Sequence, residues 1–306
     1  MSLMIVAKNK DINPWIEAFK KFDENIDIQI YPDIKNKDDI TFALVWSQND
    51  INFTQFKNLK CISSMGAGVD HILSNQTILN DIVITKIVDE RLVESMWEYL
   101  LSVVMNIVTN QYKYIQHQKN IIWQPIQARN ISNTTIGIMG LGQLGKVMVE
   151  KFSKMHFKVK GYSSSQKNIQ GVETFTTLEP FAKDVDILIN LLPLTPDTKD
   201  ILNYELFTKL NKESYLVNVG RGEHLNEEAL LKALHENILE GAVLDVFSTE
   251  PLEPKHPFWK NEKIIITPHS ASITDAQSVT NQIMENYKRV QSGMEVFNKI
   301  NRKSGY

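Results

Sequence analysis

Short hydrophobic runs alternate with amphipathic stretches along most of this chain. In the N-terminal third, the runs predict strands over residues 4–7, 26–31, 41–47, 59–65 and 82–86. The stretch Pro14–Phe22 has apolar residues at helical spacing and a proline near its start, which predicts a helix. Strands that alternate with helices are typical of a parallel sheet with helices on both faces.

The same alternation returns in the second half of the chain. It predicts helices over 146–155, 227–236 and 274–292, and strands over 136–139, 158–162, 185–192, 214–219, 241–246 and 263–267. A chain of 306 residues is long enough for two buried cores. We therefore expect an α/β protein with two Rossmann-like domains, each a doubly wound parallel sheet. We also expect the last helix to fold back on the first domain.

A long and mostly apolar stretch, Glu90–Asn110, predicts a helix that joins the two domains. We place the first domain at residues 1–100 and 272–306, and the second, inserted into it, at residues 101–271. Residues 111–126 are polar and aromatic, with little apolar material for a core of their own. This stretch is therefore either a loop or an arm that packs on a partner subunit.

Three glycines directly follow the strand expected at 136–139, in the pattern Gly140-x-Gly142-x-x-Gly145. Strand, glycine turn and helix in this order are the context of a dinucleotide-binding fingerprint. The first glycine would permit a tight turn, the second the close approach of a pyrophosphate, and the third the packing of helix on strand. The alternative is a turn with a purely structural role.

Composition narrows the possible function classes. The net charge is −3, so the chain lacks the positive excess typical of nucleic-acid binding. The single cysteine, Cys61, excludes an internal disulfide, and its apolar neighbours indicate a buried thiol. The histidines show no metal-ligand spacing, no apolar run is long enough for a membrane span, and the first residues carry no signal-peptide pattern. A cytoplasmic enzyme without a metal ion fits these observations, as would many other soluble proteins.

Three polar side chains, Arg221, Glu250 and His269, each come shortly after the end of a predicted strand. Ligands of an open parallel sheet bind outside the carboxyl ends of its strands, so we expect these side chains beside the glycine turn. Taken singly, the arginine could cap the next helix, the glutamate could be a solvated turn acid, and the histidine could lie on a surface loop. Together they form a set suited to hydride transfer.

Several motifs in the same order make the sequence resemble the D-isomer-specific 2-hydroxyacid dehydrogenase family. They are GAGVDHIL at 66–73, WQP at 123–125, GLGQLG at 140–145, INLLPLTP at 189–196, NVGRG at 218–222, DVFSTEPL at 245–252, TPHSA at 267–271 and the C-terminal RKSGY. The resemblance covers essentially the whole chain. Within this family, the motifs GAGVDHIL, WQP, INLLPLTP and RKSGY resemble the glyoxylate/hydroxypyruvate reductase A type more specifically.

The resemblance implies reduction of a small 2-oxo acid, glyoxylate or hydroxypyruvate, by a nicotinamide cofactor. Arg221 offers a planar, permanently charged fork that suits the substrate carboxylate. His269 would be the general acid that protonates the carbonyl oxygen, since its charge changes near neutral pH. Glu250 would orient the imidazole and favour its charged form. Backbone N–H groups of Ala67 and Gly68 would hold the other substrate oxygens.

Three aromatic residues are further candidates. Trp46 ends a predicted strand and would line the substrate pocket, although core packing explains it equally well. His71 follows the glycine loop and could approach the site. Trp123 lies in the expected arm, and in related reductases such a tryptophan reaches into the active site of a neighbouring subunit. The resemblance therefore implies a homodimer.

The resemblance also extends the expected cofactor contacts, with Asp245 near the nicotinamide carboxamide. The others are Gln143, Leu144, Leu192, Pro193, Val219, Gly220, Ser270 and Ala271. An acid about 20 residues after the glycines would select NAD, but Ser163, Ser164, Ser165 and Lys167 stand in this region instead. Their hydroxyl and ammonium groups could bind a 2′-phosphate, which favours NADPH over NADH. The alternative is that the serines simply form a loop.

Two other functions remain open at this point. The same residues would serve a D-2-hydroxyacid dehydrogenase that acts on another 2-oxo acid. A non-catalytic module that senses NAD(P)H would also need the glycine turn. It would not need Arg221, Glu250 and His269, so their presence favours an enzyme.

Overall fold

The computed structural model describes residues 1–8, 10–46 and 51–302, and the chain divides into two compact units. One unit is Met1–Leu92 with Thr274–Tyr306, and the other is Val93–Ile273. Ser47, the last residue of one predicted strand, lies outside the described residues, as do the last four residues of the RKSGY motif.

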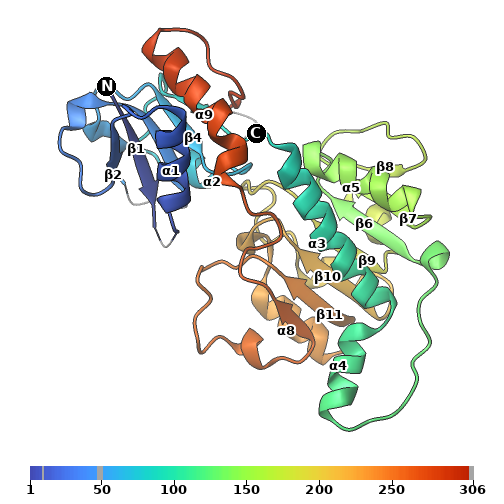
Figure 1. Cartoon of the computed structure of the whole chain (residues 1–306). Coiled ribbons are helices and arrows are strands. Elements are labelled where there is room, and N and C mark those ends of the chain that lie inside the picture. The colour runs from blue at the N-terminus through green and yellow to red at the C-terminus, as the bar shows by residue number, and fades with distance from the viewer. Residues whose placement is uncertain (9, 47–50, 303–306) are drawn as a thin grey trace. The chain divides into compact units, whose positions relative to one another are not determined.

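The first unit contains a five-stranded, all-parallel sheet in the order β2-β1-β3-β4-β5 (Figure 1). Its strands are β1 (Ser2–Ala7), β2 (Ile28–Ile30), β3 (Ile40–Trp46), β4 (Cys61–Ser64) and β5 (Val83–Thr85). Its helices are α1 (Asn13–Phe22), α2 (Asp70–Leu73) and α9 (Ala276–Gln291). The five predicted strands are all present, most of them shorter than predicted because β-ladder pairing stops before the hydrophobic run does.

Both faces of this sheet are covered, which explains its nearly continuous hydrophobic strands. Leu3 and Ile5 point toward one face and pack with residues of α1 and α9. Met4 and Val6 point to the opposite face and pack with the segments that connect β3, β4 and β5. The last helix, which we expected to fold back on the first domain, is α9, and it lies against α1 within the first unit (Figure 1).

The second unit contains a seven-stranded parallel sheet in the order β12-β11-β10-β9-β6-β7-β8. Its strands are β6 (Thr135–Met139), β7 (Lys158–Tyr162), β8 (Glu173–Phe175), β9 (Ile187–Asn190), β10 (Ser214–Asn218), β11 (Leu239–Leu244) and β12 (Ile264–Ile266). Its helices are α4 (Gln111–Lys119), α5 (Gln143–Lys154), α6 (Leu178–Ala182), α7 (Tyr204–Phe207) and α8 (Glu227–His235), together with most of α3 (Glu90–Val108).

This sheet is doubly wound, as predicted. Ile136 and Ile138 pack on one face with α3 and α5, whereas Met139 packs on the other face with α6, α7 and α8. Because successive side chains of β6 point to opposite faces of the sheet, they pack in two separate hydrophobic cores. Strand β6 lies between β7 and β9, so the glycine turn that follows it opens at the middle of the carboxyl edge.

Of the two alternatives for residues 111–126, a loop or an arm that packs on a partner subunit, the structure does not fit a plain loop, because the first part of this stretch is helix α4. None of its residues is buried, and it lacks the apolar stripe that marks a helix in a sequence. The edge strand β8 was also not predicted. Among the described helices, none is both long and apolar enough to cross a lipid bilayer.

Candidate active site

The glycine turn lies between β6 and α5, and at two of its glycines the surrounding backbone leaves no room for a Cβ atom. Gly140 has φ +99°, and a Cβ on it would lie 2.7 Å from the carbonyl carbon of Leu191. A Cβ on Gly145 would lie 1.7 Å from the carbonyl oxygen of Gly140. Any side chain at either position would push the strand, the turn and the helix apart.

Gly142 is different, because nothing lies within 4 Å of the position its Cβ would take. It is the N-cap of α5, and no side chain caps the first-turn N–H groups. These groups have no acceptor within the helix and lie at the positive end of its dipole. Open space, free donors and positive potential together fit a pyrophosphate, so the turn suits a dinucleotide cofactor.

Arg221 lies in the loop after β10, and the backbone of this loop is fixed on both sides. The N–H of Arg221 donates to Nδ1 of His224 at 3.1 Å, and its carbonyl accepts from Nδ2 of Asn218 at 3.0 Å. Its own Nη1 donates to the carbonyl of Gly220 at 2.7 Å. A Cβ on Gly222 would lie 1.9 Å from the carbonyl carbon of Phe247, so this glycine lets the Arg221 loop touch the loop that carries Glu250.

His269 and Glu250 come together across two loops. The His269 Nδ1 lies 2.8 Å from Oε2 of Glu250, and the N–H of Phe247 donates to Oε1 at 3.0 Å. Burial raises the pKa of Glu250. The hydrogen bond and charge of His269, the N–H of Phe247 and the charge of Arg221 lower it further than burial raises it, so the net pKa lies below its ordinary value. The arginine, the glutamate and the histidine therefore interact electrostatically within one unit.

The turn that carries His269 is held by the buried carboxylate of Asp245. Asp245 accepts hydrogen bonds from the Thr267 hydroxyl at 2.6 Å and from the N–H groups of Ser270 and Ala271 at 2.8 and 2.9 Å. These donors flank His269, whose φ of +50° is uncommon for a residue with a side chain. The sequence predicts Asp245 beside the cofactor, and the structure adds this role in shaping the histidine turn.

Tyr99 of α3 extends this network. Its hydroxyl lies 2.7 Å from that of Thr267. The single proton of the Thr267 hydroxyl goes to Asp245, so Tyr99 is the donor in this pair. Burial raises the pKa of Tyr99, which keeps the phenol protonated and able to donate.

Sequence reasoning missed a second buried polar network, formed by Asn190, Asn218 and His224. All three are fully buried. Nδ2 of Asn190 lies 2.9 Å from Oδ1 of Asn218 and 2.8 Å from Nδ1 of His224. Since Nδ1 of His224 lies opposite two N–H donors, it is the acceptor nitrogen of a neutral ring. The sequence feature that could have indicated this network is an asparagine inside each of two hydrophobic runs, INLL at 189–192 and VNV at 217–219.

The residues expected to select the cofactor lie after β7. Ser163 is buried, and its hydroxyl donates to the carbonyl of Ser165 at 2.8 Å. Ser164, Ser165 and Lys167 have exposed side chains. Loop formation therefore accounts for the hydroxyl of Ser163 and leaves the other three side chains accessible.

In the first unit, the loop after β4 presents unused backbone donors. The Ser64 hydroxyl donates to the carbonyl of Gly68 at 2.7 Å and accepts from the N–H of Gly66 at 3.1 Å, which closes the loop. Within the described part of the chain, the N–H groups of Ala67 and Gly68 donate no hydrogen bond. Trp46 is half-buried beside this loop, with its ring centroid 6.2 Å from that of His71.

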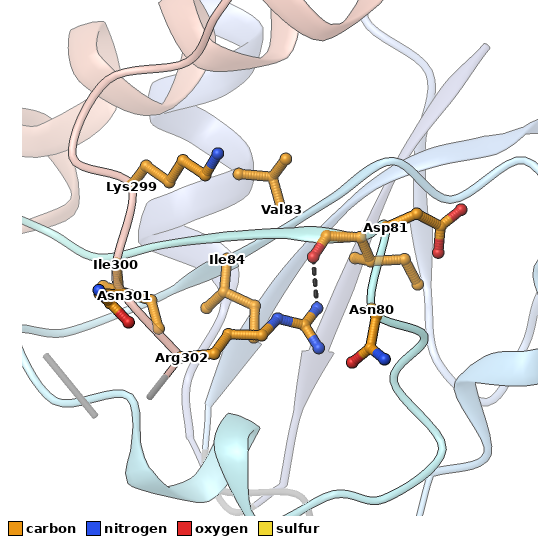
Figure 2. Close-up of a pocket in the computed structure, with 9 residues that line it drawn as sticks. Asn80, Asp81, Val83, Ile84, Lys299, Ile300, Asn301 and Arg302 are labelled. Carbon is orange, nitrogen blue, oxygen red and sulfur yellow. Dashed lines mark hydrogen bonds between the residues drawn. The ribbon is translucent and has the colours of Figure 1, made fainter. Parts of the chain in front are cut away.

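A separate pocket of about 480 Å³ lies in the first unit and contains none of these residues. Figure 2 shows that it lies between β5 and the segment 299–302, where the Arg302 guanidinium donates to the carbonyl of Ile82. It also donates to the carbonyl of Leu79 at 2.8 Å. These contacts hold Arg302 against the segment that leads into β5. Among the described residues, no group of three or more His, Cys, Asp or Glu side chains could hold a metal ion.

A family model for the D-isomer specific 2-hydroxyacid dehydrogenase, NAD binding domain, matches residues 101–271, more than half of the chain. The chain belongs to this family. It is therefore a NAD(P)-dependent dehydrogenase, and the glycine turn of the second unit lies within the matched NAD binding domain. The non-catalytic sensing module considered from the sequence is set aside.

Known relatives of this dehydrogenase cover nearly its whole length. A glyoxylate/hydroxypyruvate reductase A from Serratia proteamaculans is 39% identical over 82% of this chain and 83% of its own. The NADPH-dependent glyoxylate/hydroxypyruvate reductase of Sinorhizobium meliloti, solved with NADP and sulfate, is 31% identical with a TM-score of 0.90 over 100% of both chains. A probable 2-hydroxyacid dehydrogenase from Rhizobium etli, solved with NADP, HEPES and L(+)-tartaric acid, is 32% identical with a TM-score of 0.88 over 100% of this chain and 99% of its own.

Proposed function

We propose that this dehydrogenase reduces glyoxylate or hydroxypyruvate to the corresponding 2-hydroxy acid, with NADPH as its preferred cofactor. The observation that carries the proposal is the 2.8 Å contact between His269 Nδ1 and Glu250, with the charge of Arg221 acting on the same carboxylate. The Serratia and Sinorhizobium relatives, which are named for these substrates, support the choice of 2-oxo acid.

In this proposal each side chain has one task. Arg221 binds the substrate carboxylate, while the N–H groups of Ala67 and Gly68 hold the remaining oxygens. A nicotinamide cofactor, when bound, would supply a hydride to the carbonyl carbon. His269 delivers a proton to the carbonyl oxygen, and Glu250 stabilises the imidazolium before transfer. The C–H and O–H bonds formed in this way complete the 2-hydroxy acid, and the neutral imidazole regains a proton from solvent.

We assign the cofactor to residues 101–271 and the substrate to residues 1–100 with 272–306. Gly140, Gly142 and Gly145, with the first turn of α5 at Gln143 and Leu144, would hold the pyrophosphate. Leu192, Pro193, Val219, Gly220, Asp245, Ser270 and Ala271 would line the rest of the cofactor site, and Trp46 would line the substrate side.

NADPH is favoured because the segment after β7 offers no acid to repel a 2′-phosphate. The exposed side chains of Ser164, Ser165 and Lys167 are suitable donors. The test is kcat/KM for NADPH and NADH with glyoxylate, hydroxypyruvate and a panel of other 2-oxo acids. A strong preference for NADH would refute the cofactor choice. A higher kcat/KM for a larger 2-oxo acid than for glyoxylate and hydroxypyruvate would refute the substrate choice. Near wild-type turnover of His269→Ala with intact cofactor binding would remove His269 from the mechanism.

A homodimer is also part of the proposal, because the segment around α4 exposes apolar side chains that a monomer would have no reason to keep. Ile121 and Trp123 are almost fully exposed, and Ile115 and Ile122 are about half exposed. Light scattering of the wild type and of Trp123→Ala tests this. If the wild type is monomeric, or if Trp123→Ala changes neither assembly nor substrate range, this part of the proposal is wrong.

A further inference from the structure

A lysine side chain, Lys10, lies at the carboxyl edge of the first unit's sheet and has no role in the proposed reaction. In the order β2-β1-β3-β4-β5, strand β2 lies on one side of β1, and the next strands in the chain, β3, β4 and β5, lie on the other side. The topological switch point is therefore between β1 and β3. Ala7 and Trp46 are paired in register at the carboxyl ends of these two strands. Open α/β sheets bind ligands in the crevice outside such a point.

Lys10 and Trp46 meet at this switch point. The Lys10 Nζ lies 3.8 Å from the centroid of the Trp46 ring, a cation–π contact. The edge of the same ring reaches the loop after β4, because Trp46 Cζ3 lies 3.1 Å from the position of a Cβ on Gly66. The same indole ring therefore contacts both the Lys10 ammonium and the loop whose N–H groups are offered to the substrate.

The ammonium of Lys10 has no counter-ion in the described part of the chain. Burial lowers the pKa of Lys10, and no acidic group among residues 1–8, 10–46 and 51–302 acts against this effect. The neighbouring carboxylate of Asp11 accepts a hydrogen bond from the N–H of Asn13 at 3.0 Å. A partly buried charge without a counter-ion is costly, and an anionic ligand beside it would offset this cost.

We infer that Lys10 is a specificity-determining residue that binds a second carboxylate of the substrate, so that 2-oxo dicarboxylic acids such as oxaloacetate are also reduced. The inference rests on the proposed function, since it takes the reacting end of the substrate to be held by the N–H groups of Ala67 and Gly68 in the same unit. The Trp46 ring then lies against the methylene carbon of the substrate. The ammonium binds the far end of the molecule.

The experiment compares oxaloacetate with 2-oxobutyrate, which carries a methyl group in place of the second carboxylate. Lys10→Met keeps an unbranched stem on the Trp46 ring and removes the charge. We expect the ratio of kcat/KM for oxaloacetate to kcat/KM for 2-oxobutyrate to fall about tenfold, the effect of losing one charge-assisted hydrogen bond. The matched control is Lys8→Met, which changes an exposed lysine and leaves the ratio at its wild-type value.

Inhibition of glyoxylate reduction by malonate is a second readout, because malonate is not turned over. We expect its inhibition constant to rise about tenfold in Lys10→Met, while that of propionate stays constant. If the ratio and the malonate constant are both unchanged while the wild type reduces glyoxylate, the inference is overturned and the proposed function stands. If the wild type reduces no 2-oxo acid, the proposed function itself fails.

Discussion

Replacement of Glu250 by glutamine separates the charge of this residue from its shape. The carboxylate accepts two hydrogen bonds, from the N–H of Phe247 and from Nδ1 of His269, through its two oxygens. An amide has only one acceptor oxygen, so Glu250→Gln cannot accept both. If the amide oxygen stays with Phe247, the amide NH₂ faces Nδ1 and favours a neutral imidazole. The variant would then lack the charged proton donor.

The size of the effect follows from the contact. A hydrogen bond to a charged group contributes about 1.5–3 kcal/mol. The side chains of His269 and Glu250 are 30% and 37% exposed, so solvent screens the pair and the lower end of this range applies. A loss of about 1.5–2 kcal/mol in the transition state corresponds to a fall of about 10- to 30-fold in kcat/KM.

The assay is the rate of NADPH oxidation with glyoxylate, together with the NADPH dissociation constant from fluorescence titration. Glu253→Gln is the matched control, because it makes the same chemical change at an exposed side chain three residues along the loop. We expect the control to retain wild-type rates and both variants to bind NADPH normally. A Glu250→Gln enzyme within twofold of the wild type would refute the role given to this carboxylate.

The lowered pKa of Glu250 adds a pH dependence to the same comparison. A carboxyl group whose pKa is depressed on folding stabilises the native state above its unfolded pKa of about 4.3, and this contribution disappears as pH falls through the folded value. We therefore expect wild type to exceed Glu250→Gln in unfolding free energy at neutral pH and the difference to shrink below about pH 4. Urea titrations at both pH values measure it, and a difference that grows on acidification would contradict the assigned direction.

Four further substitutions have distinct expected outcomes. Gly145→Ala places a methyl group against the Gly140 carbonyl and should lower the free energy of unfolding by about 1–3 kcal/mol or more. Gly142→Ala should melt like wild type but bind NADPH at least about tenfold more weakly. Equal melting temperatures for the two variants would contradict this. Thr267→Val removes a donor to Asp245 and should lose about 1–3 kcal/mol of stability along with kcat, and an unchanged kcat would show that the histidine turn holds without it. Lys167→Ala should lower kcat/KM for NADPH about five- to tenfold with little effect on NADH, while the exposed Lys212→Ala alters neither.

All strands of the two sheets except β8 were predictable, because they are covered on both faces, which leaves a hydrophobic run in the sequence. Helix α4 and strand β8 were not, and the reason is physical. No residue of α4 is buried, and β8 is an edge strand with an exposed first residue, so neither leaves a periodic apolar signal. Their form depends on the rest of the fold more than on local hydrophobicity.

The candidate site was predictable where its chemistry lies in side chains that stand out near strand ends, such as Arg221 and His269. The groups that hold those side chains in position were not. The positive φ of His269 and the ring orientation of His224 depend on hydrogen bonds between segments far apart in the chain, from the N–H groups of Ser270 and Ala271 to Asp245 and between Asn190 and His224. A sequence pattern records such contacts only as a polar residue inside an apolar run.

The absence of a side chain at Gly222 has a consequence for engineering. Its backbone fits against that of Phe247, so the loops that carry Arg221 and Glu250 share one contact surface. An insertion or a bulky substitution in either loop would shift the other. Attempts to widen the pocket by remodelling the arginine loop would therefore also disturb the acid–base pair, and libraries aimed at new substrates should vary both loops jointly while keeping this glycine.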